Sequence, residues 1–112
     1  MTKLEKHQLH QNEISQLESN VFLDMSGLIN LTLFANRLVR IENETFNGLE
    51  NLFWLALYQN FIQEIEINAF GQVGKLIWLQ LNENRLTLLR NGTFGGASNL
   101  NSLTLDRNQG TF

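Results

Sequence analysis

The sequence has no cysteine and no proline, and only two histidines among its 112 residues. Without cysteine there can be no disulfide framework, no thiol nucleophile and no cysteine-based zinc site. The apolar residues fall in short runs, and none approaches the roughly 20 consecutive residues that a membrane-spanning helix needs. The polar opening, residues 1–13, does not resemble a signal peptide. We therefore expect no membrane span in this chain and no chemistry that depends on thiols.

Clustered positive charge is also lacking. The formal net charge is −3, and the basic residues are scattered: Lys3, Lys6, Arg37, Arg40, Lys75, Arg85, Arg90 and Arg107. This distribution predicts no nucleic-acid surface. The two histidines, His7 and His10, have no converging catalytic partners, and there is no glycine-rich phosphate loop or metalloprotease motif. We expect no enzyme activity, no metal and no cofactor.

What the sequence does contain is a repeat of 24 residues with the template LxxLxLxxNxLxxLxxxxFxxL. The copies occupy residues 4–27, 28–51, 52–75 and 76–99, with a partial copy at residues 100–112. Asparagine recurs at Asn36, Asn60 and Asn84, and phenylalanine recurs in the same way at Phe46 and Phe70. A repeat of this length predicts a solenoid in which each coil packs only on its neighbours. We treat residues 1–112 as one domain.

This template resembles the leucine-rich repeat in the 24-residue form of Toll-like receptors, Slit-like guidance proteins and variable lymphocyte receptors. The resemblance implies an α/β fold: a right-handed solenoid with a parallel sheet on the concave face, and mostly irregular loops and short turns on the convex face. It also implies a non-enzymatic protein-recognition module from an extracellular receptor or a secreted immune or adhesion protein. Members of this kind usually end in disulfide-bearing caps. Because these caps are lacking, we expect an internal segment of a longer ectodomain, a gene fragment or an engineered piece.

Each strand is predicted to centre on the LxL of its repeat, near residues 6–10, 30–34, 54–58, 78–82 and 102–106. Alternation along a strand points both leucines inward and the intervening residue outward. The asparagines are expected to form a structural ladder that pairs backbone groups in the turn. The phenylalanines are expected to stack as a spine on the convex side. The convex carboxylates are read as a solvated surface: Glu42, Glu44, Glu64 and Glu66.

Aromatic residues at outward strand positions predict a binding surface. Trp54 and Trp78 share one slot in adjacent repeats, and Phe34 and Tyr58 share another. Exposed aromatics of this kind are enriched at interface hot spots and form apolar patches with a function. The predicted ligand surface on the concave face comprises Asn30, Thr32, Phe34, Trp54, Tyr58, Trp78, Gln80, Asn82 and Asp106. A protein ligand fits an aromatic centre with a polar rim best.

Three other interpretations stay open. The aromatics could cover one another or pack against residues of a longer parent protein. The chain could be a structural scaffold that associates with itself through the open ends of its solenoid. The tryptophan pair could instead hold a sugar, which would make the chain a carbohydrate-binding module.

Three glycosylation sequons are present, at Asn30, Asn43 and Asn91. The motif has low specificity. Asn43 and Asn91 occupy the same repeat slot on the predicted convex side, where a glycan would leave the concave face clear. Asn30 lies on the predicted sheet face, where a glycan would obstruct binding. The sequons favour an extracellular origin.

Overall fold

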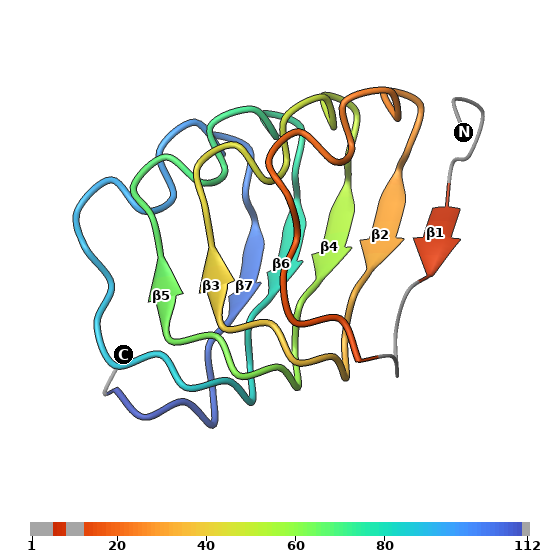
Figure 1. The fold of residues 1–112 in the computed structure, drawn as a ribbon. Helices are drawn as coiled ribbons and strands as arrows, with labels where there is room; N and C mark the ends of the chain where they lie inside the picture. Colours follow the sequence, from red (N-terminus) through yellow and green to blue (C-terminus); the bar gives the residue numbers. More distant parts are fainter. Residues whose placement is uncertain (1–5, 9–12, 111–112) are drawn as a thin grey trace.

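The computed structural model describes residues 6–8, as backbone, and residues 13–110. The chain winds as a coil, and each turn contributes one short strand to a parallel five-stranded sheet (Figure 1). The strands are β1 (Lys6–Gln8), β2 (Asn30–Thr32), β4 (Trp54–Ala56), β6 (Trp78–Gln80) and β7 (Ser102–Thr104). Neighbouring strands pair at equivalent repeat positions, so that Trp54 lies beside Trp78. The predicted leucine-rich-repeat solenoid is confirmed.

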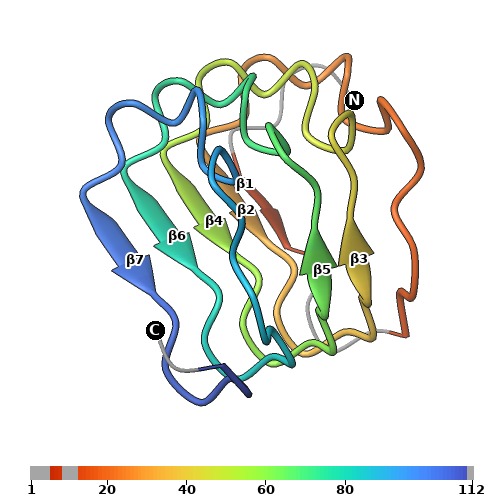
Figure 2. The same cartoon turned by 90° about the vertical axis from the view of Figure 1, so that its left-hand side faces the viewer.

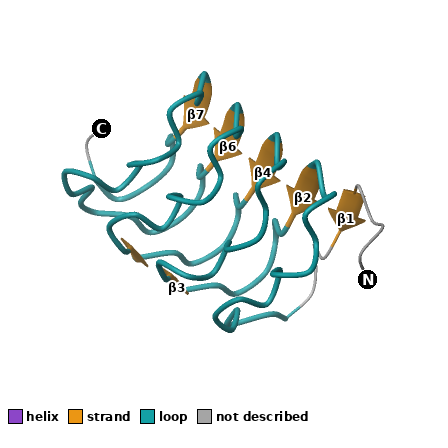
Figure 3. Cartoon of the chain, turned by 90° about the horizontal axis from the view of Figure 1, so that it is seen from above, coloured by secondary structure: helices purple, strands orange, loops and turns teal. Residues whose placement is uncertain are grey.

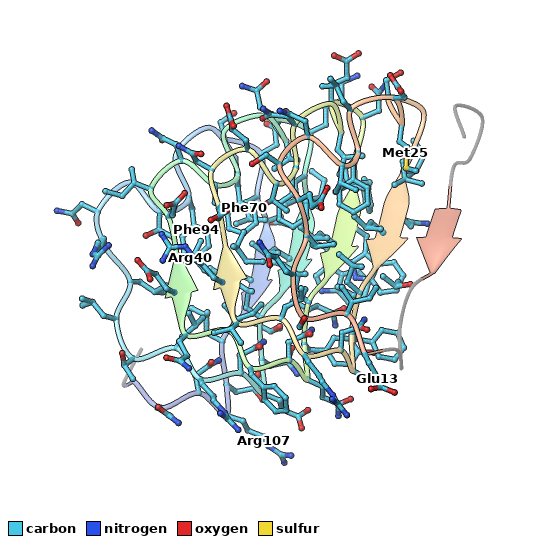
Figure 4. The ribbon with its side chains drawn as sticks, in the orientation of Figure 1. Glu13, Met25, Arg40, Phe70, Phe94 and Arg107 are labelled. Carbon is cyan, nitrogen blue, oxygen red and sulfur yellow. The ribbon has the colours of Figure 1, made fainter. Side chains whose placement is uncertain are left out.

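The core lies between the five-stranded sheet and the opposite side of the coil. Leu55 and Leu57 flank the central position of their repeat and are fully buried, as the alternation along the strand predicts. The phenylalanines form the expected spine, with ring centroids 5.9 Å apart for Phe46 and Phe70 and 5.7 Å apart for Phe70 and Phe94. Figure 4 shows Phe70 and Phe94 side by side. Stacking of equivalent residues therefore gives the solenoid one continuous core.

The asparagine ladder forms as predicted in the described part of the chain. Asn60 accepts the Leu38 N–H at 3.1 Å and donates through Nδ2 to the carbonyl oxygens of Leu33 and Leu57, at 3.1 and 3.0 Å. Asn84 repeats this pattern one coil later. Each buried amide thus joins its own coil to the preceding one. It pairs backbone groups that would be costly to bury without a partner. The expected first member of the ladder, Asn12, lies outside the described residues.

The residue before each ladder asparagine has a left-handed backbone. Ala35, Gln59, Glu83 and Arg107 have φ between 58° and 60°. None of them is glycine, although glycine adopts this conformation most readily. This turn reverses the chain at the end of the strand and brings the asparagine amide into the core.

We name the side of the coil opposite the five-stranded sheet the return side. It carries a second, two-stranded parallel sheet formed by β3 (Arg40–Ile41) and β5 (Glu64–Ile65) (Figures 2 and 3). The sequence predicted mostly loops and short turns there, and the described residues contain no helix. The next coil does not extend this sheet. Leu88 and Leu89 stand at the equivalent positions without pairing to β5, and Leu88 is 64% exposed.

Candidate binding face

We name the solvent side of the five-stranded sheet the outer face. Its described side chains lie in three rows that run across the strands. The rows are Asn30, Trp54, Trp78 and Ser102; then Thr32, Ala56, Gln80 and Thr104; then Phe34, Tyr58, Asn82 and Asp106. The register of the sheet brings together all nine residues that the sequence predicted for the ligand surface.

The aromatic residues of the outer face form two stacked pairs. The ring centroids of Trp54 and Trp78 are 5.0 Å apart with an interplanar angle of 18°. Those of Phe34 and Tyr58 are 4.8 Å apart with an angle of 5°. Each ring therefore covers one side of its partner. This agrees with the alternative interpretation that the aromatics cover one another. The pairs still reach solvent: Trp78 is 37% exposed, and the other three rings are partly buried.

The middle row is less accessible than its outward position predicts. Ala56 is fully buried and Thr32 is 4% exposed. Trp54 and Tyr58 stand two residues to either side of Ala56 on the same face of the strand, so their large side chains close over it. Thr32, the register partner of Ala56, is buried as well, so the expectation that it is an accessible contact residue is wrong.

Two hydrogen bonds fix the polar side chains at the edge of the aromatic pairs. The indole Nε1–H of Trp54 donates to Oε1 of Gln80 at 2.8 Å. One coil later, the hydroxyl of Thr104 donates to Oδ1 of Asn82, also at 2.8 Å. In both carboxamides the oxygen accepts a hydrogen bond, and this bond fixes the direction in which the amide N–H groups point. Within the described part of the chain, the indole N–H of Trp78 donates to no protein group.

Charge is sparse in the three described rows of the outer face. Asp106 is the one charged residue in the three rows, and it is exposed. No lysine or arginine stands at these positions. Two exposed apolar side chains flank the face, Ile29 (36%) and Phe53 (48%), each just before a strand begins. The result is an aromatic centre with a polar, weakly acidic edge over β6 and β7 and an apolar flank.

On the return side, the structure corrects the prediction that the glutamates are only a solvated surface. Arg40 on β3 reaches three of them: Glu42 at 3.6 Å, Glu64 at 2.6 Å and Glu66 at 2.7 Å. Figure 4 shows Arg40 on the same side as β3 and β5. Two of the three contacts join neighbouring coils, because Glu64 and Glu66 belong to the next repeat. The guanidinium therefore clamps the β3–β5 pair from outside. The fourth glutamate, Glu44, is exposed and makes no ion pair among the described residues.

These contacts shift the pKa values of Arg40 and Glu66. The pKa of Glu66 is lowered, first by the Asn43 backbone N–H that donates to its carboxylate at 2.9 Å and then by the hydrogen bond from Arg40. The pKa of Arg40 is raised, chiefly by its hydrogen bond to Glu66 and by the charge of Glu64. Both shifts favour the charged forms of Arg40 and Glu66, so this ion pair acts as a structural element at the surface.

Between β5 and residues 87–90 the return side is hollow, with a volume of about 370 Å³. The carbonyl of Ile62 still accepts the Arg85 N–H, and the Asn68 N–H still donates to Gly92. Between these two hydrogen bonds, no backbone hydrogen bond of the described chain joins residues 63–67 to residues 86–91. Glu64, Arg85, Leu88 and Arg90 are among the residues that line the hollow.

The sequon asparagines occupy the positions that the repeat predicts. Asn43 and Asn91 are exposed on the return side, whereas Asn30 lies in β2 on the outer face and is partly buried.

The described residues contain no group of three or more histidine, cysteine, aspartate or glutamate side chains that could hold a metal ion. They also contain no helix that is long and apolar enough to span a membrane.

The comparisons with known proteins agree with this geometry. The family model described as leucine rich repeat matches residues 2–60 and 54–109. Among solved structures, the crystal structure of a TLR13–ssRNA13 complex is 28% identical with a TM-score of 0.85, covering 89% of this chain and 14% of that one. An internalin, InlF of Listeria monocytogenes, is 22% identical with a TM-score of 0.73, covering 96% of this chain and 29% of that one. Comparison with curated proteins gave no match. The chain belongs to the leucine-rich-repeat family.

Proposed function

We propose that the chain is a non-enzymatic recognition module that binds a protein partner on its outer face. The main support is the presence of two aromatic stacks on one face, Trp54 on Trp78 and Phe34 on Tyr58. The three described rows of this face contain one charged residue, Asp106. The leucines already fill the core, so these rings are not needed to build it. Large, rigid aromatics in a patch with few charges are the usual centre of a protein interface.

The similarity to the TLR13 structure supports an extracellular origin, as a segment of a receptor or of a secreted immune or adhesion protein. The chain spans a small part of that structure, 14% of its length. The exposed sequons at Asn43 and Asn91 support the same origin, and we propose them as the glycosylated sites. Expression in a secreting eukaryotic cell is expected to add mass that Asn43→Gln and Asn91→Gln together remove. An unshifted mass of the secreted wild-type chain would refute glycosylation.

The similar TLR13 structure is a complex with single-stranded RNA, which suggests a second ligand class. The outer face of this chain does not favour it. RNA backbones are bound largely through lysine and arginine, which release counterions, and the three described rows contain Asp106 and no cation. Titration with single-stranded RNA at low salt is therefore expected to show no binding that depends on Trp78.

The test of the protein-binding proposal starts from a displayed library of secreted and cell-surface ectodomains, screened with the purified chain. Any binder is then measured against the double variant Trp54→Ala, Trp78→Ala and against a matched control on the return side, Val39→Ala with Leu88→Ala. Loss of two hot-spot residues is expected to weaken binding at least about 100-fold. The control is expected to bind as the wild type does.

A second variant separates binding from folding. Asp106→Arg changes an exposed rim residue and leaves the stacks in place, so it is expected to weaken binding of a cationic or neutral partner without loss of stability. Binding that neither the double variant nor Asp106→Arg alters would refute the outer face as the site. Sedimentation at several concentrations tests the scaffold alternative. A mass that rises with concentration in the absence of any ligand would favour it.

A further inference from the structure

We infer that the outer face over β6 and β7 contains a subsite for a neutral saccharide, with the indole of Trp78 as its platform. This inference goes beyond the proposed protein partner and rests on different observations. They are the open ring face of Trp78, two carboxamides whose orientation is fixed, and three described rows of side chains that contain no lysine or arginine.

The uncovered ring face belongs to Trp78. One side of its indole stacks on Trp54 at 5.0 Å. The other side points toward β7, where the register partner of Trp78 is Ser102, a small and exposed residue. Neighbouring strands are about 4.8 Å apart, which is the spacing of one more flat group in the stack. The row therefore ends in an open space above Ser102, beside the free face of the Trp78 indole. A pyranose ring has the size to fill this space with its apolar face against the indole.

The polar groups beside this space are held in place before any ligand arrives. Oε1 of Gln80 accepts from Trp54, so its Nε2 donors turn away from that bond. Oδ1 of Asn82 accepts from Thr104, so its Nδ2 donors are set in the same way. Both amides are partly buried, and the Trp78 Nε1–H adds a further donor with no protein partner among the described residues. Prearranged donors lower the ordering cost of binding a polar ligand.

The class of ligand follows from the hydrogen bonds to water that the amide and indole N–H groups would lose when a ligand covers them. An apolar side chain placed over Ser102 would strip water from the amide donors and the indole N–H and offer them nothing, which costs free energy for each group left unpaired. Sugar hydroxyls accept from these donors and can donate to the carboxylate of Asp106. That carboxylate, with no cation in the three rows, disfavours sialylated, sulfated and phosphorylated sugars. The matching ligand is therefore an uncharged oligosaccharide.

On its side toward β6, the Phe34–Tyr58 pair does not offer such a space. Beyond Tyr58 the row continues with Asn82, whose carboxamide occupies the position that Ser102 leaves open beside Trp78. On the far side of Trp54 stands Asn30, which is partly buried. Trp78 is thus the ring with an open face toward β7, which makes it the specific target of the experiment.

The experiment is a glycan array that carries neutral hexose and N-acetylhexosamine oligosaccharides beside sialylated and sulfated ones, probed with the whole chain. The strongest neutral glycan is then titrated in solution by calorimetry. Tryptophan fluorescence is followed in parallel, since both tryptophans of the protein lie on this face. Wild-type protein is expected to bind neutral and not acidic glycans, with a change in fluorescence.

Two variants and one control decide the result. Trp78→Ala is expected to weaken glycan binding at least tenfold. Asn82→Asp keeps the shape and the acceptor for Thr104 but replaces the Nδ2 donor with a second carboxylate oxygen, and it is expected to weaken binding about tenfold. Phe53→Ala, an exposed aromatic at the flank, is expected to leave glycan binding unchanged.

Circular dichroism and urea unfolding show whether each variant is folded. Asn82→Asp keeps the inference testable if Trp78→Ala is unstable. Absence of neutral-glycan binding by the wild type, a preference for acidic glycans, or wild-type affinity in both variants would overturn the subsite. A protein partner found on the ectodomain library would be unaffected by that failure, so the two proposals are separable.

Discussion

The indole N–H of Trp54 donates to the side-chain oxygen of Gln80, a residue 26 positions later and one coil further along the solenoid. The bond ties the most central ring of the outer face to the neighbouring strand at a partly buried position. Trp54 stands two residues before Ala56, which is fully buried although it points outward. The binding face is therefore ordered by bonds between coils, and each such bond can be tested.

Replacing Gln80 with methionine keeps most of the side-chain volume and removes the acceptor. A lost, partly buried hydrogen bond is expected to lower the free energy of unfolding by about 0.5–1.5 kcal/mol. Urea titration followed by tryptophan fluorescence measures it. The matched control is Gln63→Met on the return side, where Gln63 is exposed. Equal stability of the two variants would mean that the Trp54–Gln80 bond contributes nothing.

Removing a ladder amide is expected to cost more. Asn60→Ala leaves the Leu38 N–H without a partner in a buried turn. It also removes one of two amide donors from the carbonyls of Leu33 and Leu57, which still accept from Asn36 and Asn84. A loss of about 1–3 kcal/mol in the free energy of unfolding is expected, because a buried N–H is left unpaired and two buried carbonyls each lose one hydrogen bond. Asn99→Ala is the control: its amide donates one exposed bond to Gly74. Similar urea midpoints for both variants would contradict the structural role of the ladder.

The left-handed position before the ladder can be tested at Gln59, whose φ is 58°. A β-branched side chain is strongly disfavoured there, so Gln59→Val is expected to destabilise the chain by about 1–2 kcal/mol. Gln59→Asn is expected to be neutral or slightly stabilising, since asparagine tolerates this region. Thermal unfolding of the two variants shows which of them is more stable. A valine variant as stable as the asparagine variant would rule out the left-handed turn in solution.

The clamp on the return side predicts a pH dependence. The pKa of Glu66 is lower in the folded chain than its ordinary value of 4.5. Its contribution to stability is therefore present above about pH 4.5 and is lost as the pH falls through the lower, folded pKa. Glu66→Gln is expected to be less stable than the wild type at pH 7, with the difference shrinking on acidification and in 1 M salt. Glu50→Gln, at an exposed residue with no ion pair among the described ones, is expected to show no such difference. A gap for Glu66→Gln that does not depend on pH would argue against the clamp.

Hydrogen exchange tests the break in the second sheet. The amides of residues 87–91 donate no hydrogen bond within the described chain, whereas Gln63 and Glu66 beside them donate to Val39 and Ile41. Exchange in segment 87–91 is expected to be orders of magnitude faster than in segment 61–66, because open amides are protected only by burial. Equal protection of the two segments would show that a third strand forms on the return side in solution.

A repeat of 24 residues was sufficient to predict the coil, the five strands, the asparagine ladder and the phenylalanine spine. Those features depend only on which residue types recur and on how strands alternate, and both can be read from a linear pattern. The nine residues predicted for the ligand surface could be placed on one face for the same reason, since residues such as Trp54 and Trp78 share a slot. The sequence could not predict that Thr32 and Ala56 would be covered. Burial at an outward position depends on how far neighbouring rings lean.

The sequence by itself determined the architecture of this protein, because residues at equal repeat positions must stack when every coil has the same length. Only the tertiary structure decided the details that give the outer face its chemistry. It set the orientation of the Gln80 and Asn82 amides, left one face of Trp78 open beside Ser102, and assembled three glutamates around Arg40. These features depend on contacts between coils, which join side chains more than 20 residues apart in the sequence. The rotamer of each side chain depends on the partners that the fold brings within reach.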